Sequence, residues 1–288
     1  MHMNSIKELI GRYDHLKTQR DNWNSHYQEL ADYMLPRKAD VVKSRSKGDK
    51  RMELIFDGTA LQAVDLLSSS LHGLLTSGAA PWFHLDMKDE EIGRDDDVRE
   101  WLQDTSQRML RGFDQSNFGT EVHEMYVDLV VFGTGCMFVE MEDGALRFST
   151  RHISEIYIQE NQFGMVDTVF RSYKSPVRQV VQRFGIENVT DYIAKKNKEK
   201  PDEEVEILHV VIPREDRDKT KVDNKNMPFA SIYIDMQSSA MLSESGFQEF
   251  PYIVPRYLKA TGETMGRSPA MVALPDVKML NLMSKTII

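Results

Sequence analysis

In the first half of the chain, apolar residues recur three or four positions apart, which is the spacing of one face of a helix. The pattern runs from Ile6 to Leu16 and continues from Trp23 to Met34, just before Pro36. It predicts a long helix, or a helical hairpin, that ends at Pro36, because proline cannot continue the hydrogen bonding of a helix.

Three further helices are predicted before residue 134. Asp57-Gly58 is typical of a turn, and the stripe after it predicts a core helix with Thr59 as its cap: Ala60, Leu61, Val64, Leu67, Leu71 and Leu74. A second helix follows the acidic run 89–97, whose carboxylates complement the positive end of a helix. A third spans 121–132 and stops at Gly133, a residue suited to a left-handed C-terminal turn.

Short runs of alternating or continuous apolar residues predict strands, most of them after Gly133. Two hairpins are expected, one across Glu142–Gly144 and one across Asn161–Gly164. Short helices are expected over 176–184 and 186–194, and a charged linker over 195–204. The expected strands are 82–85, 136–141, 145–149, 155–159, 165–173, 205–212, 229–235, 240–244 and 249–257. The fold class is therefore α+β, with N-terminal helices followed by a mainly antiparallel strand-rich section.

The sequence ends in a predicted helix that begins at Ser268-Pro269. Ser268 can cap the first amides, and Pro269 suits the first turn, where an N–H would have no partner. Pro275 is expected to bend or restart the helix, with Asp276 capping the restarted part. An apolar stripe then continues without a polar cap, through Leu280, Met283 and Ile287. We therefore expect the sequence to be a piece of a longer protein.

Charge limits the way in which the chain could handle nucleic acid. The formal net charge of −9 argues against a grip that works by neutralising phosphates. An acidic wall could instead keep passing DNA from sticking, or the charge could merely aid solubility. Basic residues concentrate in 37–51. This segment is either a solvated loop or a contact for DNA or an acidic partner, through Lys43, Arg45 and Lys47.

Cys136 is the single cysteine, so the sequence predicts no disulfide and no cysteine-based metal site, which fits a reducing cytoplasm. The longest apolar run, 130–139, is broken by Gly133 and Gly135 and is too short to cross a bilayer. No membrane partner is expected.

The sequence contains none of the common catalytic motifs considered below. The sequence has no glycine-rich phosphate loop of the Gly-x-x-x-x-Gly-Lys-Ser/Thr type, so any ATP-driven step would come from a partner. Asp95–Asp97 could bind a divalent cation, but capping of a helix is favoured because consecutive residues point in different directions. The histidines in apolar segments lack ligand spacing: His72, His84, His152 and His209. We nominate no catalytic, cofactor-binding or metal-binding residue.

Five sequence blocks follow one another in a fixed order: 23–36; 57–60 with 71–77 and 82–85; 116–118; 128–135; and 250–257 with 262–281. The last block contains Gly266-Arg-Ser-Pro-Ala270, Ala273-Leu-Pro-Asp276 and Leu280-Asn281. Together they resemble the portal, or head-to-tail connector, proteins of short-tailed bacteriophages. Met265 departs from the pattern, since the family usually has an aromatic residue there.

The resemblance implies a structural protein of a phage or prophage. It implies a wing over 1–262, helical in 1–134 and strand-rich in 135–262, with the start of a stem helix over 263–288. The clip, the second stem helix and the crown would lie outside this sequence. Copies of the chain would form a dodecameric ring at a capsid vertex, through which double-stranded DNA is packaged and ejected without sequence specificity.

The same resemblance implies the partners and the location. The partners would be a terminase motor, scaffold and capsid proteins, and tail or adaptor proteins. The protein would sit at the head-tail vertex of the virion, after assembly in the host cytoplasm. The wing-to-stem corner and subunit packing would depend on Gly266, Arg267, Ser268, Pro269, Asp276, Leu280, Asn281 and Met283. A positive φ at Gly266 would require glycine at that position.

Two other functions stay open at this point. One is a metal-dependent DNA-processing enzyme of phage or host origin that uses Asp95–Asp97. The other is a scaffold or adaptor protein that binds a partner through the C-terminal helix.

Overall fold

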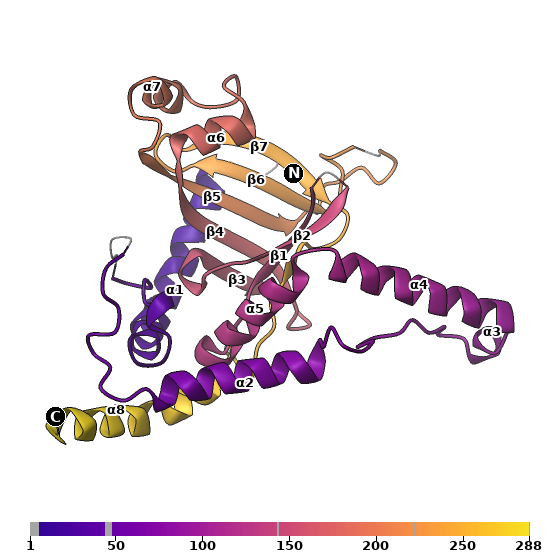
Figure 1. Ribbon diagram of the computed structural model, residues 1–288. Helices are drawn as coiled ribbons and strands as arrows, with labels where there is room; N and C mark the ends of the chain where they lie inside the picture. The colour runs from indigo at the N-terminus through magenta and orange to yellow at the C-terminus, as the bar shows by residue number, and fades with distance from the viewer. Residues whose placement is uncertain (1–5, 44–47, 143, 222, 288) are drawn as a thin grey trace. The chain divides into compact units, whose positions relative to one another are not determined.

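The computed structural model describes residues 6–43, 48–142, 144–221 and 223–287 (Figure 1). Helices precede most of the strands, and the sheets are antiparallel, so the predicted α+β class is confirmed. The chain forms two compact units. Unit 1 is the chain up to His26 together with Ser154–Pro251, and unit 2 is Tyr27–Ile153 together with the chain from Tyr252. The first helix, α1 (Ile6–Met34), contributes to both units.

Unit 1 is built on a five-stranded antiparallel sheet in the order β3-β4-β5-β6-β7. Its strands are β3 (Ile156–Glu160), β4 (Val166–Pro176), β5 (Glu204–Pro213), β6 (Phe229–Asp235) and β7 (Ala240–Phe247). The expected hairpin across Asn161–Gly164 joins β3 to β4. The expected strands over 205–212, 229–235 and 240–244 are also confirmed.

Helices cover both faces of this sheet. Ile207 and Leu208 are adjacent in β5 and fully buried, but they belong to different apolar clusters because successive side chains point to opposite faces. Leu208 packs with the first turns of α1, whereas Ile207 packs with α6 (Val177–Phe184) and α7 (Asp191–Glu199). α7 starts later than the sequence pattern predicts and occupies part of the expected linker, because the Thr190 hydroxyl caps its first turn.

Unit 2 contains most of the helices and a small sheet in the order β2-β1-β8. After the end of α1 come a 3-10 turn (Pro36–Lys38), α2 (Thr59–Leu75), α3 (Glu90–Gly93), α4 (Asp96–Asp114), α5 (Phe118–Phe132), β1 (Met137–Glu142), β2 (Ala145–Thr150), β8 (Tyr252–Ile253) and α8 (Pro269–Ile287). A second 3-10 turn, Ile153–Glu155, lies at the boundary between the units. The predicted hairpin of β1 and β2 is confirmed, as is the end of α5 at Gly133, which has a φ of 76°.

The core of unit 2 lies between α5 and the β1–β2 hairpin and is rich in aromatic side chains. Phe118 packs edge-on against Phe148, with ring centroids 5.1 Å apart. Trp82 stacks on Phe118 at 5.7 Å, which brings the segment after α2 into the same cluster. No helix in the described part of the chain has an apolar stretch of the length that a bilayer requires.

Several local predictions are wrong. Residues 82–85 form no strand, because the backbone N–H of Leu85 donates to the Ser106 hydroxyl (2.8 Å) instead of to a neighbouring strand. Thr59 does not cap α2; its own N–H donates to the Asp57 carboxylate (2.9 Å), and the helix starts at Thr59. Leu74 is 83% exposed and therefore lies outside the core.

The segment 249–257 is mostly irregular and does not join the large sheet. Only Tyr252–Ile253 forms a strand, and it pairs with β1 in unit 2. Pro251 and Pro255 bracket these two residues and lack the N–H groups that a longer ladder needs.

Candidate functional site

The expected wing-to-stem corner is the place where α8 begins, and in unit 2 it packs against the end of α5. Ser268 is 3% exposed, and its hydroxyl takes part in two hydrogen bonds. Its hydroxyl donates to the carbonyl of Val131 (2.7 Å) and accepts from the N–H of Met271 (3.1 Å). The predicted cap is thus confirmed, and the same hydroxyl ties the first turn of α8 to the last turn of α5.

Two glycines allow the backbones to approach at this corner. A Cβ on Gly133 would collide with the backbone of Gly266 and Arg267, and a Cβ on Gly266 would collide with the Gly133 carbonyl and the Arg256 side chain. Gly133 has a positive φ, whereas Gly266 does not, so a positive φ is not the reason for glycine at position 266. Gly266 is required because of the close approach of backbones rather than because of its own dihedral angle.

Backbone and side-chain hydrogen bonds fix this contact. The N–H of Gly266 donates to the Thr134 hydroxyl (2.8 Å), and Thr134 is 1% exposed. The N–H of Tyr257 donates to the Gly133 carbonyl (2.9 Å), and Leu258 and Arg267 exchange two backbone bonds of 3.2 and 2.7 Å. The buried polar groups of the corner therefore satisfy one another.

The Arg267 side chain points to the surface. It forms an ion pair with Glu263, and its Nε donates to Glu263 Oε2 at 2.8 Å. This hydrogen bond lowers the pKa of the Glu263 carboxyl from its usual value. Because the pair is exposed, it orients the turn before α8 but adds little stability.

Asn281 fastens α8 to the segment that precedes α2. Its Oδ1 accepts from the N–H groups of Phe56 (2.7 Å) and Asp57 (3.2 Å), and its Nδ2 donates to the carbonyl of Leu54 (2.7 Å). The residue is 8% exposed, so the amide replaces water for three backbone groups. Lys278 adds an ion pair to Glu29 in the second part of α1.

The remaining nominated residues of α8 face outward. Leu280 and Met283 are 40% and 57% exposed, and Asp276 is exposed as well. Pro275 lies inside one continuous helix, so the predicted restart with Asp276 as its cap is wrong. The buried side of α8 is instead made by Ala270, Leu274 and Asn281.

A partly buried ion pair that sequence patterns did not reveal joins the 3-10 turn after α1 to α5. Lys38 Nζ lies 2.6 Å from Asp128 Oδ1 and 3.1 Å from Glu124 Oε2. Burial raises the pKa of the Asp128 carboxyl, although Lys38 opposes this change. Lys38 is therefore no exposed basic residue, and the prediction of an exposed loop from 37 onward is wrong at this position.

Of the three basic residues predicted to contact DNA or an acidic partner, the structure describes Lys43. Lys43 forms an ion pair with Asp32, with 3.0 Å between Nζ and Oδ2. Arg45 and Lys47 lie outside the described residues.

The acidic run is used for helix capping. The Asp95 carboxylate accepts from the N–H groups of Asp97 (3.0 Å) and Val98 (3.3 Å) at the start of α4. Asp89 caps α3 in the same way, and Asp96 pairs with Arg99. Within the described ranges, no three His, Cys, Asp or Glu side chains converge as metal ligands would.

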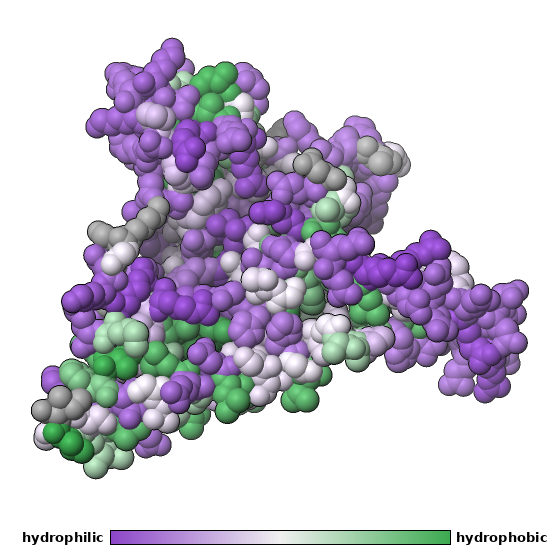
Figure 2. All heavy atoms as spheres, in the orientation of Figure 1, coloured by the Kyte–Doolittle hydropathy of each residue, from purple (hydrophilic) through white to green (hydrophobic). Residues whose placement is uncertain are grey.

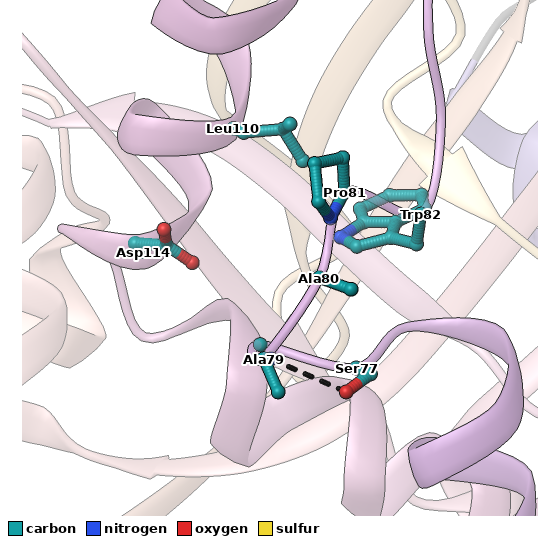
Figure 3. A pocket seen from close by; sticks show the side chains of 8 residues that line it. Ser77, Ala79, Ala80, Pro81, Trp82, Leu110 and Asp114 are labelled. Atoms are coloured by element: carbon teal, nitrogen blue, oxygen red, sulfur yellow. Dashed lines mark hydrogen bonds between the residues drawn. The ribbon is translucent and has the colours of Figure 1, made fainter.

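A pocket of about 150 Å³ lies between the 77–82 segment and α4 (Figure 3). The lining residues include one carboxylate, Asp114, which lies apart from the Ser77 hydroxyl in this view. That hydroxyl accepts from the N–H of Ala79 at 3.2 Å. These groups form no nucleophile and base pair, so no reaction is proposed here.

The chain is similar to known proteins over nearly its whole length. A family model described as bacteriophage head to tail connecting protein matches residues 6–288. The chain is similar to a probable portal protein of Bordetella phage BPP-1, with 33% identity over 279 residues, covering 95% of this chain and 50% of that protein. It is also similar to a portal protein of Salmonella phage epsilon15, with 35% identity over 286 residues, covering 97% of this chain and 51% of that protein.

The chain thus spans about half the length of the curated relatives it matches. The family match covers the corner, both glycines and all of α8 up to the last residue. On these grounds, the chain belongs to the family of bacteriophage head to tail connecting proteins.

Proposed function

We propose that this chain is the wing and the beginning of the stem of a portal subunit, with the wing over 1–262 and the stem helix from 263. Copies of the complete subunit would form a ring at a capsid vertex through which double-stranded DNA is packaged and ejected. The observation that carries this proposal is the family match over residues 6–288, together with two relatives, one named a probable portal protein and the other a portal protein.

The surface of α8 supports a role in subunit contact. The helix is fastened to its own unit by Ser268 and Asn281, yet most of its large apolar side chains are exposed: Val272, Met279, Leu280, Leu282, Met283 and Ile287. Figure 2 shows hydrophobic side chains gathered over α2 and α8. Burying an aliphatic side chain contributes about 1.5–3 kcal/mol, so neighbouring subunits that cover this face would gain substantially.

The net charge of the chain suits a channel through which DNA passes better than a protein that binds DNA tightly. With a net charge of −9, the chain as a whole repels the DNA backbone, which favours passage without sequence-specific contact. Lys43, Arg45 and Lys47 are candidates for local contact with DNA or with an acidic partner. We propose no catalytic role, and the energy for packaging would come from a separate terminase motor.

The proposal extends to the other partners and to the location. Scaffold and capsid proteins would contact the ring during head assembly in the host cytoplasm, and tail or adaptor proteins would bind it afterwards. In the finished virion the protein would lie at the head-tail vertex.

Ring formation is tested on the complete product of the gene that contains these residues. Negative-stain electron microscopy and native mass spectrometry should show closed rings of one copy number. Leu282→Glu, at a side chain that is 62% exposed, should leave the helix content unchanged but reduce the yield of rings at least tenfold.

Gln182→Glu adds the same charge at an exposed position of α6 and should leave ring assembly intact. A wild-type product that stays monomeric at micromolar concentration would exclude the portal role. Equal ring yields for the two variants would exclude α8 as the subunit contact.

A further inference from the structure

A second pocket, unrelated to the corner, lies in unit 1 at the edge of the five-stranded sheet. It has a volume of about 450 Å³. One side is formed by the end of α6 and the turn after it, the floor by β7, and the other side by the loop before β6. The lining residues are Arg183, Phe184, Asn188, Lys225, Met241, Leu242, Ser243 and Glu244.

The α6 and β7 walls of this pocket are fixed by packing. Phe184 contacts the Tyr233 ring, with centroids 5.0 Å apart, and Leu242 belongs to the same buried cluster. Asn188 Nδ2 donates to the carbonyl of Phe184 (2.8 Å), which holds the turn after α6 against the end of the helix. The pocket is therefore part of the folded sheet and helix structure rather than a gap in a loose loop.

The charges in the pocket are unbalanced. Arg183 Nη2 donates to the Tyr233 hydroxyl (2.7 Å), and its guanidinium lies 4.8 Å from the centre of that ring, so its position is set. Among the residues that the structure describes, no carboxylate lies within ion-pair distance of Arg183 or Lys225. The lining carboxylate, Glu244, is already paired with Arg214 at 3.1 Å, and both side chains are 8% exposed.

The floor of the pocket is an open strand edge. β7 is last in the order of the sheet and, among the described strands, pairs with β6 alone. The loop before β6 lies against one end of β7, since a Cβ on Gly246 would collide with Asn224 and Met227. At the other end Met241 is 43% exposed. The part of the edge that stays open, 241–244, is the part that lines the pocket.

We propose that this pocket is a docking site for an extended acidic segment of a partner protein. The backbone of the segment adds as a strand to the outer edge of β7 at residues 241–244, beside the shift of register opposite Tyr233 and Ile234. Its carboxylates pair with Arg183 and Lys225, and an apolar side chain of the segment rests on Phe184 and Met241. Charge complementarity selects an acidic partner, because a basic segment would meet two unpaired cations.

The test uses a fluorescein-labelled heptapeptide of alternating glutamate and valine, together with a matched peptide of lysine and valine. Fluorescence anisotropy at low salt should show binding of the acidic peptide only. Hydrogen exchange of the full chain should then slow at 241–244. Lys225→Glu, at an exposed side chain, should weaken binding of the acidic peptide about tenfold without affecting folding. Arg183→Gln, as a separate variant, should weaken binding by a larger factor.

The control variants Arg178→Gln and Lys198→Gln each remove one exposed charge from the same helical layer, and they should bind as the wild type does. Each of these results would overturn the proposal: no binding of the acidic peptide up to about 1 mM, equal binding by the wild type and Lys225→Glu, or protection elsewhere than at β7. Tighter binding of a labelled single-stranded oligonucleotide than of the acidic peptide would assign the pocket to nucleic acid and would also overturn it.

Discussion

Replacing Gly266 by alanine should destabilise unit 2 strongly, although it adds a single methyl group. The methyl group would meet the carbonyl of Gly133 and, at 2.9 Å, the Cβ of Arg256. The first obstacle is a backbone atom and the second is bonded directly to the backbone, so neither can move aside as the end of a flexible side chain could. Relief requires the end of α5 to separate from the segment before α8.

The magnitude follows from what this separation breaks. Overpacking alone costs about 1–3 kcal/mol. The movement also strains two hydrogen bonds, from Gly266 N–H to Thr134 and from Tyr257 N–H to Gly133, each worth about 0.5–1.5 kcal/mol. We therefore expect a loss of about 3 kcal/mol in the free energy of unfolding. With a urea m-value of roughly 3 kcal/mol/M, the midpoint of unfolding should fall by about 1 M.

Gly73→Ala is the matched control in the same unit. Gly73 lies inside α2, and a Cβ there would meet no atom within 4 Å. Alanine is the better helix former, so this variant should gain about 0.5–1 kcal/mol and raise the midpoint slightly. Urea unfolding is followed by circular dichroism, with hydrogen exchange at 131–135 reporting on unit 2. If Gly266→Ala unfolds at the wild-type midpoint, the close approach of the two backbones does not exist.

Three further predictions concern the same unit. Thr134→Val should leave the buried N–H of Gly266 without an acceptor and cost about 1–3 kcal/mol in urea unfolding, whereas Thr134→Ser should cost less; equal losses would contradict the hydrogen bond. Asn281→Leu should speed hydrogen exchange at 54–57 at least tenfold without unfolding α8; unchanged exchange would refute the amide contacts. Burial of His72 and, to a smaller extent, the nearby His123 lower the pKa of the His72 imidazole below 6.5. The unfolded state therefore binds a proton at a higher pH than the folded state does, and stability should fall as the pH drops below about 6.5. His72→Phe should lose less between pH 7.5 and 5.5, and an equal loss would refute this assignment.

Features that depend on neighbouring residues were largely predictable from the sequence. The β1–β2 hairpin, the left-handed turn at Gly133 and the Ser268-Pro269 start of α8 each follow from local turn and capping preferences. The strand prediction for 82–85 failed because alternation cannot tell a strand from an extended segment that packs through Trp82.

Long-range contacts account for most of what the sequence could not reveal. Nothing local to Asn281 indicates that its amide would bind the backbone at 54–57, and nothing local to Lys38 indicates Asp128 as its partner. Gly266 needs to be glycine because of Gly133, which is far away in the sequence, so no local pattern around Gly266 reveals this reason. The β7 pocket was not foreseen either, since its lining residues come from three separate segments.

The pairing of β8 with β1 sets an order of events during synthesis on the ribosome. Met137 pairs with Ile253 and Phe138 with Tyr252, and all of residues 154–251 emerge between the two strands. By the time residue 251 has emerged, every segment of unit 1 is available, whereas unit 2 still lacks the strand and helix that close it. In a nascent chain paused near this point, β1 would lack its partner β8, so one edge of the small sheet would be open to pairing with another chain.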